Sequence, residues 1–322
     1  MFAFFHRILF FFQPETAHHI AVFFLKLLPV KKDFSKAPVY LPKVASLSFK
    51  NRVGLAAGFD KNAEVFPALS NFGFGFIEVG TVTPVAQKGN PKPRLWRTPE
   101  KTLVNQMGFN NCGLEIFKEN IVKGRKKTSI PLLANIGKNK ATPNAEAYSD
   151  YEKGFLALKD CVDGFVVNIS SPNTPNLRDL QSQGFLEKIL SFAPTTVPIF
   201  VKFSADLESN DLVSLLDFVG KSRFSGVVLV NTSSKLAVDF AGKTSGGLSG
   251  TRLFEKALEK VSLAKEVLKD SKTIIGVGGV SSVEQYLKMR KAGADLVEVY
   301  TAFVYQGPRL VQTLANVEAT SV

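Results

Sequence analysis

Short apolar runs recur along most of the chain, and polar residues and a stretch of helical length follow most of them. Runs of this kind, bounded by turn-forming residues, are typical of buried strands. Helical patterns such as residues 253–268 and 283–291 separate them. Eight strand–helix repeats predict an α/β fold, the parallel (β/α)8 TIM barrel. The expected strands are residues 53–57, 76–79, 132–136, 165–168, 199–202, 227–230, 274–277 and 296–299.

One connection departs from this repeat. Residues 83–131 form a stretch too long for a single strand-to-strand crossover. Long insertions in compact domains usually carry structure of their own. We therefore expect a lid or an extra hairpin there.

The N-terminal segment has a different pattern. Six phenylalanines lie in residues 1–12, and a second apolar stretch covers residues 17–28, before Pro29. Each stretch is shorter than the roughly 20 residues that span a bilayer. A signal peptide is disfavoured, since basic residues do not lead the apolar run and no small-residue cleavage site follows it.

Two short helices that lie in the membrane interface fit this segment better, with Lys26, Lys31 and Lys32 toward anionic headgroups. The alternative is a helical hairpin packed on the protein's own core. Eight of the 28 phenylalanines fall in the first 24 residues, more than a small hairpin buries against itself, which favours the membrane. With a polar linker at residues 31–42, this predicts a membrane-associating segment at residues 1–37 and a barrel domain at residues 38–322.

Composition narrows the possible chemistry. The formal charge of +12 indicates an anionic partner, which is a nucleic acid, a membrane surface or a phosphate-bearing cofactor. The two cysteines, Cys112 and Cys161, are far apart and predict free thiols in a reducing compartment. All three histidines precede the first predicted barrel strand, which excludes a histidine-based triad or a histidine-ligated metal within the barrel.

The densest polar cluster is Asn168-Ile169-Ser170-Ser171-Pro172-Asn173, directly after an apolar run. It therefore lies at the carboxyl end of a predicted strand, where barrel enzymes keep their chemistry. Its prolines restrict the backbone and hold the hydroxyl and amide groups in place. An ordinary Asn/Ser/Pro turn is the alternative interpretation.

Other predicted strand ends carry amides, hydroxyls, lysines and glycines, and Asp60 is the only acidic residue among them. These residues converge on one face of a barrel and suit a planar, amide-rich, anionic ligand. Glycine groups near residues 246–250 and 276–279 favour a phosphate-bearing cofactor. The strand ends are Gly58-Phe59-Asp60-Lys61, Gly80-Thr81, Asn135 with Lys138, Lys202, Asn231-Thr232, Gly278-Gly279 and Tyr300-Thr301.

Together with three further motifs, these residues resemble dihydroorotate dehydrogenase. The further motifs are Gly89-Asn90-Pro91-Lys92-Pro93-Arg94, Asn105-Gln106-Met107-Gly108-Phe109-Asn110 and Asn135-Ile136-Gly137-Lys138-Asn139. The chain is most similar to the membrane-associated, quinone-dependent class (class 2), over essentially its whole length. The resemblance implies one FMN per chain and oxidation of dihydroorotate to orotate in de novo pyrimidine (UMP) biosynthesis, with a membrane quinone as electron acceptor. It also implies a monomer, peripheral membrane association, on the cytoplasmic face of the inner membrane if the source is bacterial, and no nucleic-acid partner.

The resemblance further implies that Ser171 takes the C5 proton of the substrate while C6 passes a hydride to flavin N5. Because no histidine lies in the barrel, the Asn168–Asn173 cluster must supply its own proton acceptor, and a serine hydroxyl needs a relay to serve as a base.

Site residues follow from the same resemblance. Substrate contacts are expected from Lys61, Asn105, Gln106, Met107, Gly108, Phe109, Asn168, Asn173, Asn231 and Thr232. FMN contacts are expected from Ala57, Gly58, Phe59, Asp60, Lys61, Thr81, Asn135, Asn168, Lys202, Val230, Gly250, Gly279, Tyr300 and Thr301. His18, Arg97 and Tyr300 are candidates for the quinone site. Val230 and Asn176 depart from residues frequent in relatives.

Three alternatives are compatible with parts of the sequence. The soluble class of the same enzyme has cysteine in place of Ser171 and lacks the N-terminal hairpin. A flavin-dependent tRNA dihydrouridine synthase would use the basic surface for RNA, but it requires a cysteine acid and an RNA-binding domain after the barrel. A non-enzymatic membrane-bound barrel would not need the ring of amides.

Overall fold

The computed structural model describes residues 8–30, 43–44, 47–98, 100–241 and 246–319. Its centre is a closed barrel of parallel strands in the order β10-β12-β13-β3-β4-β7-β8-β9, which confirms the predicted fold and all eight predicted strands. The barrel strands are β3 (Val53–Leu55), β4 (Phe76–Val82), β7 (Leu132–Ile136), β8 (Gly164–Asn168), β9 (Ile199–Lys202), β10 (Gly226–Leu229), β12 (Thr273–Val277) and β13 (Leu296–Val299).

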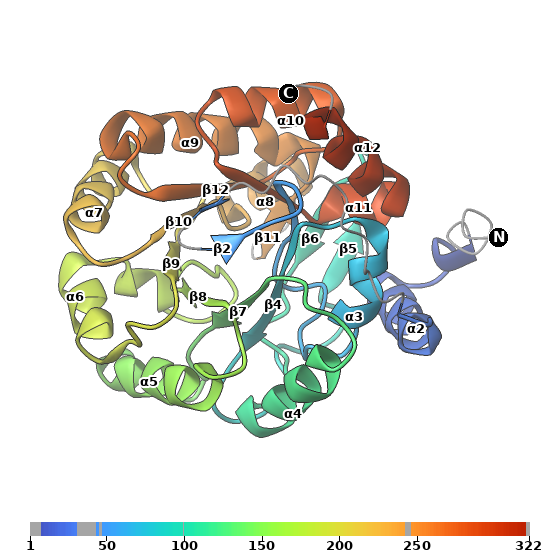
Figure 1. Cartoon of the computed structure of the whole chain (residues 1–322), viewed down its shortest axis with the longest axis horizontal. Helices are drawn as coiled ribbons and strands as arrows, with labels where there is room; N and C mark the ends of the chain where they lie inside the picture. The colour runs from blue at the N-terminus through green and yellow to red at the C-terminus, as the bar shows by residue number, and fades with distance from the viewer. Residues whose placement is uncertain (1–7, 31–42, 45–46, 99, 242–245, 320–322) are drawn as a thin grey trace.

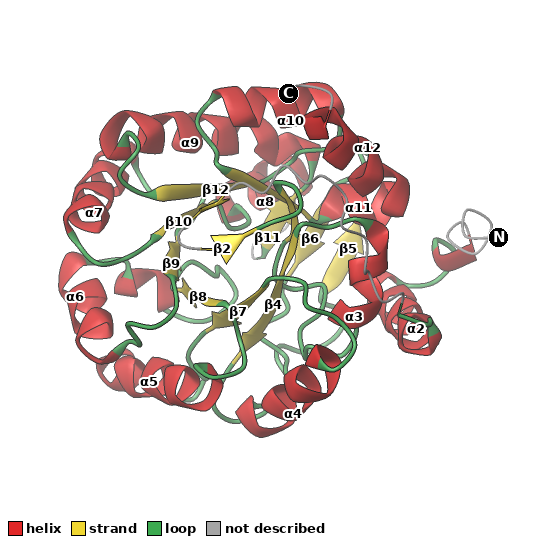
Figure 2. Cartoon of the chain, in the orientation of Figure 1, coloured by secondary structure: helices red, strands yellow, loops and turns green. Residues whose placement is uncertain are grey.

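Helices surround this barrel as an outer ring (Figures 1 and 2). The helices after the N-terminal segment are α3 (Phe66–Leu69), α4 (Leu114–Arg125), α5 (Ala147–Leu158), α6 (Gln183–Phe192), α7 (Ser209–Lys221), α8 (Ser234–Ala241), α9 (Phe254–Leu268), α10 (Val283–Lys291), α11 (Thr301–Gln306) and α12 (Pro308–Ala319). Short 3₁₀ turns lie at η1 (Ser70–Phe72), η2 (Asn144–Glu146), η3 (Leu177–Leu180) and η4 (Thr251–Leu253).

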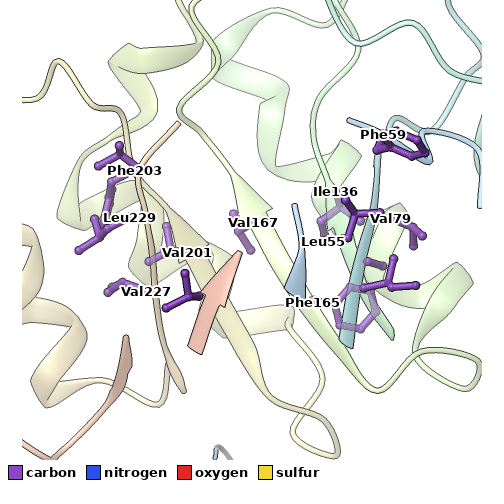
Figure 3. Close-up of a cluster of buried hydrophobic side chains, with 14 of the residues drawn as sticks. Leu55, Phe59, Val79, Ile136, Phe165, Val167, Val201, Phe203, Val227 and Leu229 are labelled. Atoms are coloured by element: carbon purple, nitrogen blue, oxygen red, sulfur yellow. The ribbon is translucent and has the colours of Figure 1, made fainter. Parts of the chain in front are cut away.

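Strand side chains alternate between the two faces of the barrel wall, as the two-residue period of a strand requires. One set belongs to the large apolar cluster that also contains the helix side chains, and Figure 3 labels ten of its members. The other set fills the barrel interior with a smaller apolar cluster that includes Phe49, Phe76, Phe200 and Leu296. Phe49 follows a two-stranded hairpin, β1 (Lys43–Val44) with β2 (Leu47–Ser48), and closes the amino-terminal end of the barrel against Phe76.

The long connection at residues 83–131 contains the expected hairpin, β5 (Leu95–Arg97) with β6 (Leu103–Asn105), followed by α4. A third strand, β11 (Gly247–Ser249), pairs antiparallel with β6. No local sequence signal indicates this pairing, because it joins segments more than 140 residues apart. The resulting sheet lies beside the carboxyl ends of the barrel strands and forms one wall of the site described below.

The N-terminal helix α2 (Pro14–Leu27) lies outside the helix ring, beside α3 and β5 (Figure 1). Ala17 and Leu25 are buried against the barrel domain, whereas Phe23 and Phe24 are exposed. In the described residues, no helix is long and apolar enough to cross a membrane. Most of the first predicted helix, residues 1–7, and the linker at residues 31–42 lie outside the described residues.

We predict that Phe76→Ala destabilises the barrel by about 3–5 kcal/mol. The Phe76 ring is fully buried, packs on Phe49 and occupies the space beside Gly54, where a Cβ would lie 2.2 Å from the ring. The midpoint of urea denaturation measures this loss. Leu156→Ala, at an exposed position on α5, is the matched control and is expected to change stability by no more than about 0.5 kcal/mol. Equal urea denaturation midpoints for the two variants would contradict the packing of Phe76 in the barrel interior.

Candidate active site

A cavity of about 410 Å³ opens at the carboxyl ends of the barrel strands. This volume lies within the range of cofactor and small-molecule sites. Residues from the barrel loops, the β5-β6-β11 sheet and α2 line it. The sequence-predicted residues in the lining are His18, Ala57, Gly58, Lys61, Thr81, Asn105, Met107, Gly108, Phe109, Asn168, Ser171, Asn173, Lys202, Val230, Asn231, Thr232, Gly250, Gly279, Tyr300 and Thr301.

Five predicted site residues, Phe59, Asp60, Arg97, Gln106 and Asn135, lie outside this lining. The Asp60 carboxylate accepts hydrogen bonds from three successive backbone N–H groups at the start of α3, and burial raises its pKa to about 6. Asp60, the only acidic residue among the predicted strand ends, is therefore not part of the cavity lining. The carboxyl-bearing residues that line the cavity are Glu15, from α2, and Glu298, from β13.

An amide network holds one wall of the cavity. The Asn168 amide group donates to Thr81 Oγ1 at 3.0 Å and to Asn135 Oδ1 at 3.1 Å. Thr81 Oγ1 itself donates to Asn135 Oδ1, and Asn135 Nδ2 donates to Glu78 at 2.5 Å. These bonds are buried, so the side chains have fixed orientations. Asn135 therefore lies behind Thr81 and Asn168 and positions them.

The two adjacent serines of the predicted cluster have different environments. Ser170 Oγ donates to Asn168 Oδ1 at 3.0 Å and accepts from Asn231 Nδ2 at 2.9 Å. Ser171 Oγ accepts the backbone N–H of Asn173 at 3.2 Å and faces the cavity. Ser170 therefore holds the turn, whereas Ser171 presents its hydroxyl group to a bound ligand.

An ion-pair anchor under the Ser171 loop was not predicted from the sequence. Arg178 donates to Asp206 Oδ2 at 3.0 Å, to the carbonyl oxygen of Ser170 at 3.2 Å and to that of Thr232 at 3.2 Å. Lys256 contacts Asp206 from the other side at 2.9 Å. Burial of Asp206 would raise its pKa, but hydrogen bonds from serine and lysine side chains lower it well below the usual range. Asp206 is therefore a fixed anion that ties the Ser171 loop to the Asn231–Thr232 segment.

A charged layer lies inside the barrel below the cavity. Lys202 Nζ is 2.9 Å from Glu78 Oε2 and 3.8 Å from Glu298 Oε2, and all three residues are buried. Burial alone would lower the pKa of Lys202, but the negative charge of Glu78 and the hydrogen bond to it outweigh that effect and raise the pKa. Lys202 is therefore a fixed cation at the cavity floor. The sequence predicted Lys202 but neither glutamate, although the two-residue period of β4 places Glu78 on the same face as Phe76.

Lys61 and His18 lie at the end of the cavity nearest α2. Lys61 Nζ donates to the carbonyl oxygen of Gly58 at 2.6 Å, and burial lowers its pKa to about 8. His18 packs edge-on against Phe59, with ring centroids 5.2 Å apart. Burial and the charge of Lys61 lower the pKa of His18 well below its usual value, so its imidazole is neutral at pH 7.

Buried ionic contacts and backbone hydrogen bonds hold the N-terminal segment against this end of the cavity. Arg94 donates to Glu15 from both Nε and Nη2, at distances down to 2.7 Å. Arg97 Nη1 donates to the carbonyl oxygens of Phe10 and Phe12 at 3.0 and 2.9 Å. Arg97 therefore ties the segment before α2 to strand β5 and does not itself line the cavity.

Comparison with known proteins identifies relatives over nearly the whole chain. Residues 41–317 match the family model described as dihydroorotate dehydrogenase. A protein of Christiangramia forsetii named dihydroorotate dehydrogenase (quinone) is 41% identical, and the match covers 95% of each chain. A Sulfurovum protein with the same name is 40% identical over 96% of this chain and 90% of its own. The structure of Eimeria tenella DHODH in complex with ferulenol superimposes with a TM-score of 0.85 at 31% identity, covering 96% of this chain and 92% of that one.

We predict that Arg94→Met loosens α2 without unfolding the barrel. The change leaves the buried carboxylate of Glu15 without its closest cation, and breaking a buried ion pair in this way costs about 3–5 kcal/mol. Hydrogen exchange of the α2 backbone amides should accelerate at least tenfold, with exchange in the barrel strands unchanged. Lys92→Met is the matched control, because Lys92 lies 3.6 Å from the same carboxylate but is mostly exposed. Unchanged exchange in the Arg94 variant would refute the anchoring role.

Proposed function

The chain belongs to the dihydroorotate dehydrogenase family, and from that premise we propose that it oxidises (S)-dihydroorotate to orotate with FMN and passes the electrons to a membrane quinone. The observation that carries the proposal is the convergence of Ser171, a ring of amide side chains and the Lys202 cation on one cavity. We also propose that the reaction belongs to pyrimidine biosynthesis and that the protein is a monomer with one bound FMN.

The residues present fit FMN. Gly250 and Gly279 line the cavity with φ of +100° and +74°, and a Cβ at Gly279 would lie 2.6 Å from the backbone nitrogen of Phe254. These glycines let the backbone approach a phosphate group. Lys202 would lie beside the flavin ring, where a fixed cation stabilises added negative charge. When bound, FMN supplies the acceptor for the hydride that leaves C6 of the substrate.

The substrate would be held by matched hydrogen bonds. Asn105, Asn173, Asn231 and Thr232 line the cavity, and the amide group of Asn173 already donates to Asn105 Oδ1 at 2.9 Å. Asparagine side chains offer both a donor and an acceptor, as a pyrimidine ring with two carbonyl groups and two N–H groups requires. Lys61 supplies a positive charge for the substrate carboxylate.

Ser171 is proposed to take the proton from C5. Its Oγ accepts one hydrogen bond, from the Asn173 N–H, so the hydroxyl orientation is restrained while a lone pair remains for the proton. The residue is 5% exposed, and a buried hydroxyl must pass on its own proton as it gains one. We propose that a water molecule in the cavity receives that proton. Binding also acidifies C5, because hydrogen bonds to the neighbouring carbonyl group stabilise the charge that develops.

We predict that Ser171→Ala slows reduction of the bound flavin by dihydroorotate by about 10²- to 10⁴-fold, because the variant lacks the proton acceptor. Anaerobic stopped-flow absorbance of the flavin measures the rate, and the spectrum before mixing verifies that FMN remains bound. Ser191→Ala removes an exposed hydroxyl outside the cavity and should reduce flavin at the wild-type rate. Reduction of the Ser171 variant at the wild-type rate would refute the role.

The N-terminal segment, residues 1–37, is proposed to attach the enzyme peripherally to a membrane and to admit quinone, at the cytoplasmic face of the inner membrane if the source is bacterial. Two features support this. Glu15 and His18 of α2 line the cavity, so the helix adjoins the cofactor site. The other face of α2 and its flanks expose apolar side chains that would enter the membrane interface. These exposed residues are Phe11, Phe12, Phe23, Phe24, Leu27 and Leu28.

We predict that the double substitution Phe23→Ser and Phe24→Ser weakens binding to anionic vesicles at least tenfold, since each phenylalanine contributes about 1.5–3 kcal/mol when its side chain leaves water. Vesicle sedimentation measures the binding. Flavin reduction by dihydroorotate should be unchanged, while reoxidation by a long-chain quinone held in the vesicles should slow. The matched control changes Ile116 and Val122, exposed residues of α4, to serine. Equal vesicle binding by the two double variants would count against attachment through α2.

A further inference from the structure

Glu298 carries a buried carboxyl group inside the barrel that receives no hydrogen bond from an N–H or O–H donor of the described residues. It lies in the middle of β13 with no exposed surface, and it lines the cavity. The side chain within hydrogen-bonding reach of its carboxyl oxygens is instead the carboxyl group of Glu78. A buried carboxylate without hydrogen bonds is strongly unfavourable, so the environment favours the uncharged acid.

The groups around Glu298 favour the same state. Lys202 is the nearest cation at 3.8 Å, but it lies closer to Glu78, at 2.9 Å. Glu78 also accepts from Asn135 at 2.5 Å and from the backbone N–H of Ala57 at 3.3 Å. One lysine therefore lies near two carboxyl groups, and the hydrogen bonds that Glu78 accepts favour Glu78 as the ionised one.

The adjacent strands do not change this balance. Glu298 is in register with Gly54 of β3 and Val277 of β12, and neither strand contains an ionisable side chain. Charged groups that face Glu298 within the barrel are thus Glu78 and Lys202. Burial and the negative charge of Glu78 raise the pKa of Glu298 well above its usual value.

We propose that Glu298 is held as a neutral carboxylic acid at the cavity floor, an uncharged hydrogen-bond donor beside the Lys202–Glu78 pair, and that it thereby favours reduction of bound flavin. Reduction adds negative charge, which a neutral donor stabilises and a carboxylate would oppose. With Glu298 uncharged, Glu78 and Lys202 form a neutral pair; with Glu298 ionised, the three groups would carry a net negative charge. Glu298 touches the cofactor in this arrangement, and this part of the inference rests on the proposed FMN site.

The protonation state can be measured on the protein without flavin. The infrared spectrum of wild type minus Glu298→Gln at pH 7 should contain a C=O band of a protonated carboxyl group, because glutamine preserves the shape and removes only that group. Glu284→Gln, which removes an exposed carboxylate paired with Lys288, should instead remove carboxylate bands. Loss of carboxylate bands in the Glu298 variant would overturn the proposal.

The effect on flavin is tested by its midpoint potential, measured at pH 7 against reference dyes in wild type, Glu298→Gln and Glu298→Leu. Glutamine retains an uncharged donor and should change the ratio of reduced to oxidised flavin less than threefold. Leucine lacks a donor and should lower that ratio at least tenfold, about 30 mV for a two-electron couple. A tenfold or greater rise in the ratio of reduced to oxidised flavin in Glu298→Gln would show that Glu298 is an anion. Equal midpoint potentials in all three proteins would show that Glu298 does not act on flavin. Either result overturns the proposal.

These readouts are independent of the substrate. If Glu298→Leu prevents folding, Glu298→Met takes its place, and the infrared result with Glu298→Gln still decides the protonation state. Dye titration requires bound FMN but not dihydroorotate, so a flavoprotein that dihydroorotate does not reduce would contradict the proposed substrate alone. Wild-type reduction by dihydroorotate combined with a Glu298 carboxylate would contradict only this inference.

Discussion

The site depends on one constraint, which is the balance of charge inside a closed barrel. Lys202 and Glu78 are 2.9 Å apart with almost no contact with solvent, and a second carboxyl group, that of Glu298, lies 3.8 Å from the same lysine. A buried ion pair of this kind gains little stability over apolar packing. The ion pair instead determines where the positive charge of Lys202 lies, which is directly below the cavity.

A continuous chain of hydrogen bonds extends from this layer to the Ser171 loop. Glu78 accepts from Asn135, Asn135 accepts from Asn168, and Asn168 accepts from Ser170. Each member is held by its neighbours, so the donors and acceptors that face the cavity are oriented before a ligand arrives. Preorganisation of this kind lowers the cost of stabilising charge during a reaction. The Asp206–Arg178 ion pair secures the same loop from outside the barrel.

Much of the fold and of the cavity lining was predictable, because both depend on local signals. Short apolar runs end in polar residues, and those polar residues meet once the strands form a barrel. What the sequence did not reveal depends on contacts between distant segments. The pairing of β11 with β6, the Glu15–Arg94 contact and the Asp206 anchor have no local signature. Glu78 and Glu298 lie within predicted strands, and their burial follows from the face of the strand that they occupy, which the two-residue period gives for Glu78 from Phe76.

The proposed function requires one cavity that holds FMN and dihydroorotate above the buried lysine. Anaerobic mixing of the purified, FMN-loaded protein with dihydroorotate, followed by a long-chain quinone, tests it most directly. We expect one FMN per chain, loss of the oxidised flavin absorbance on addition of dihydroorotate and its return with quinone. A protein that cannot be loaded with FMN, or whose flavin stays oxidised in the presence of dihydroorotate, would contradict it.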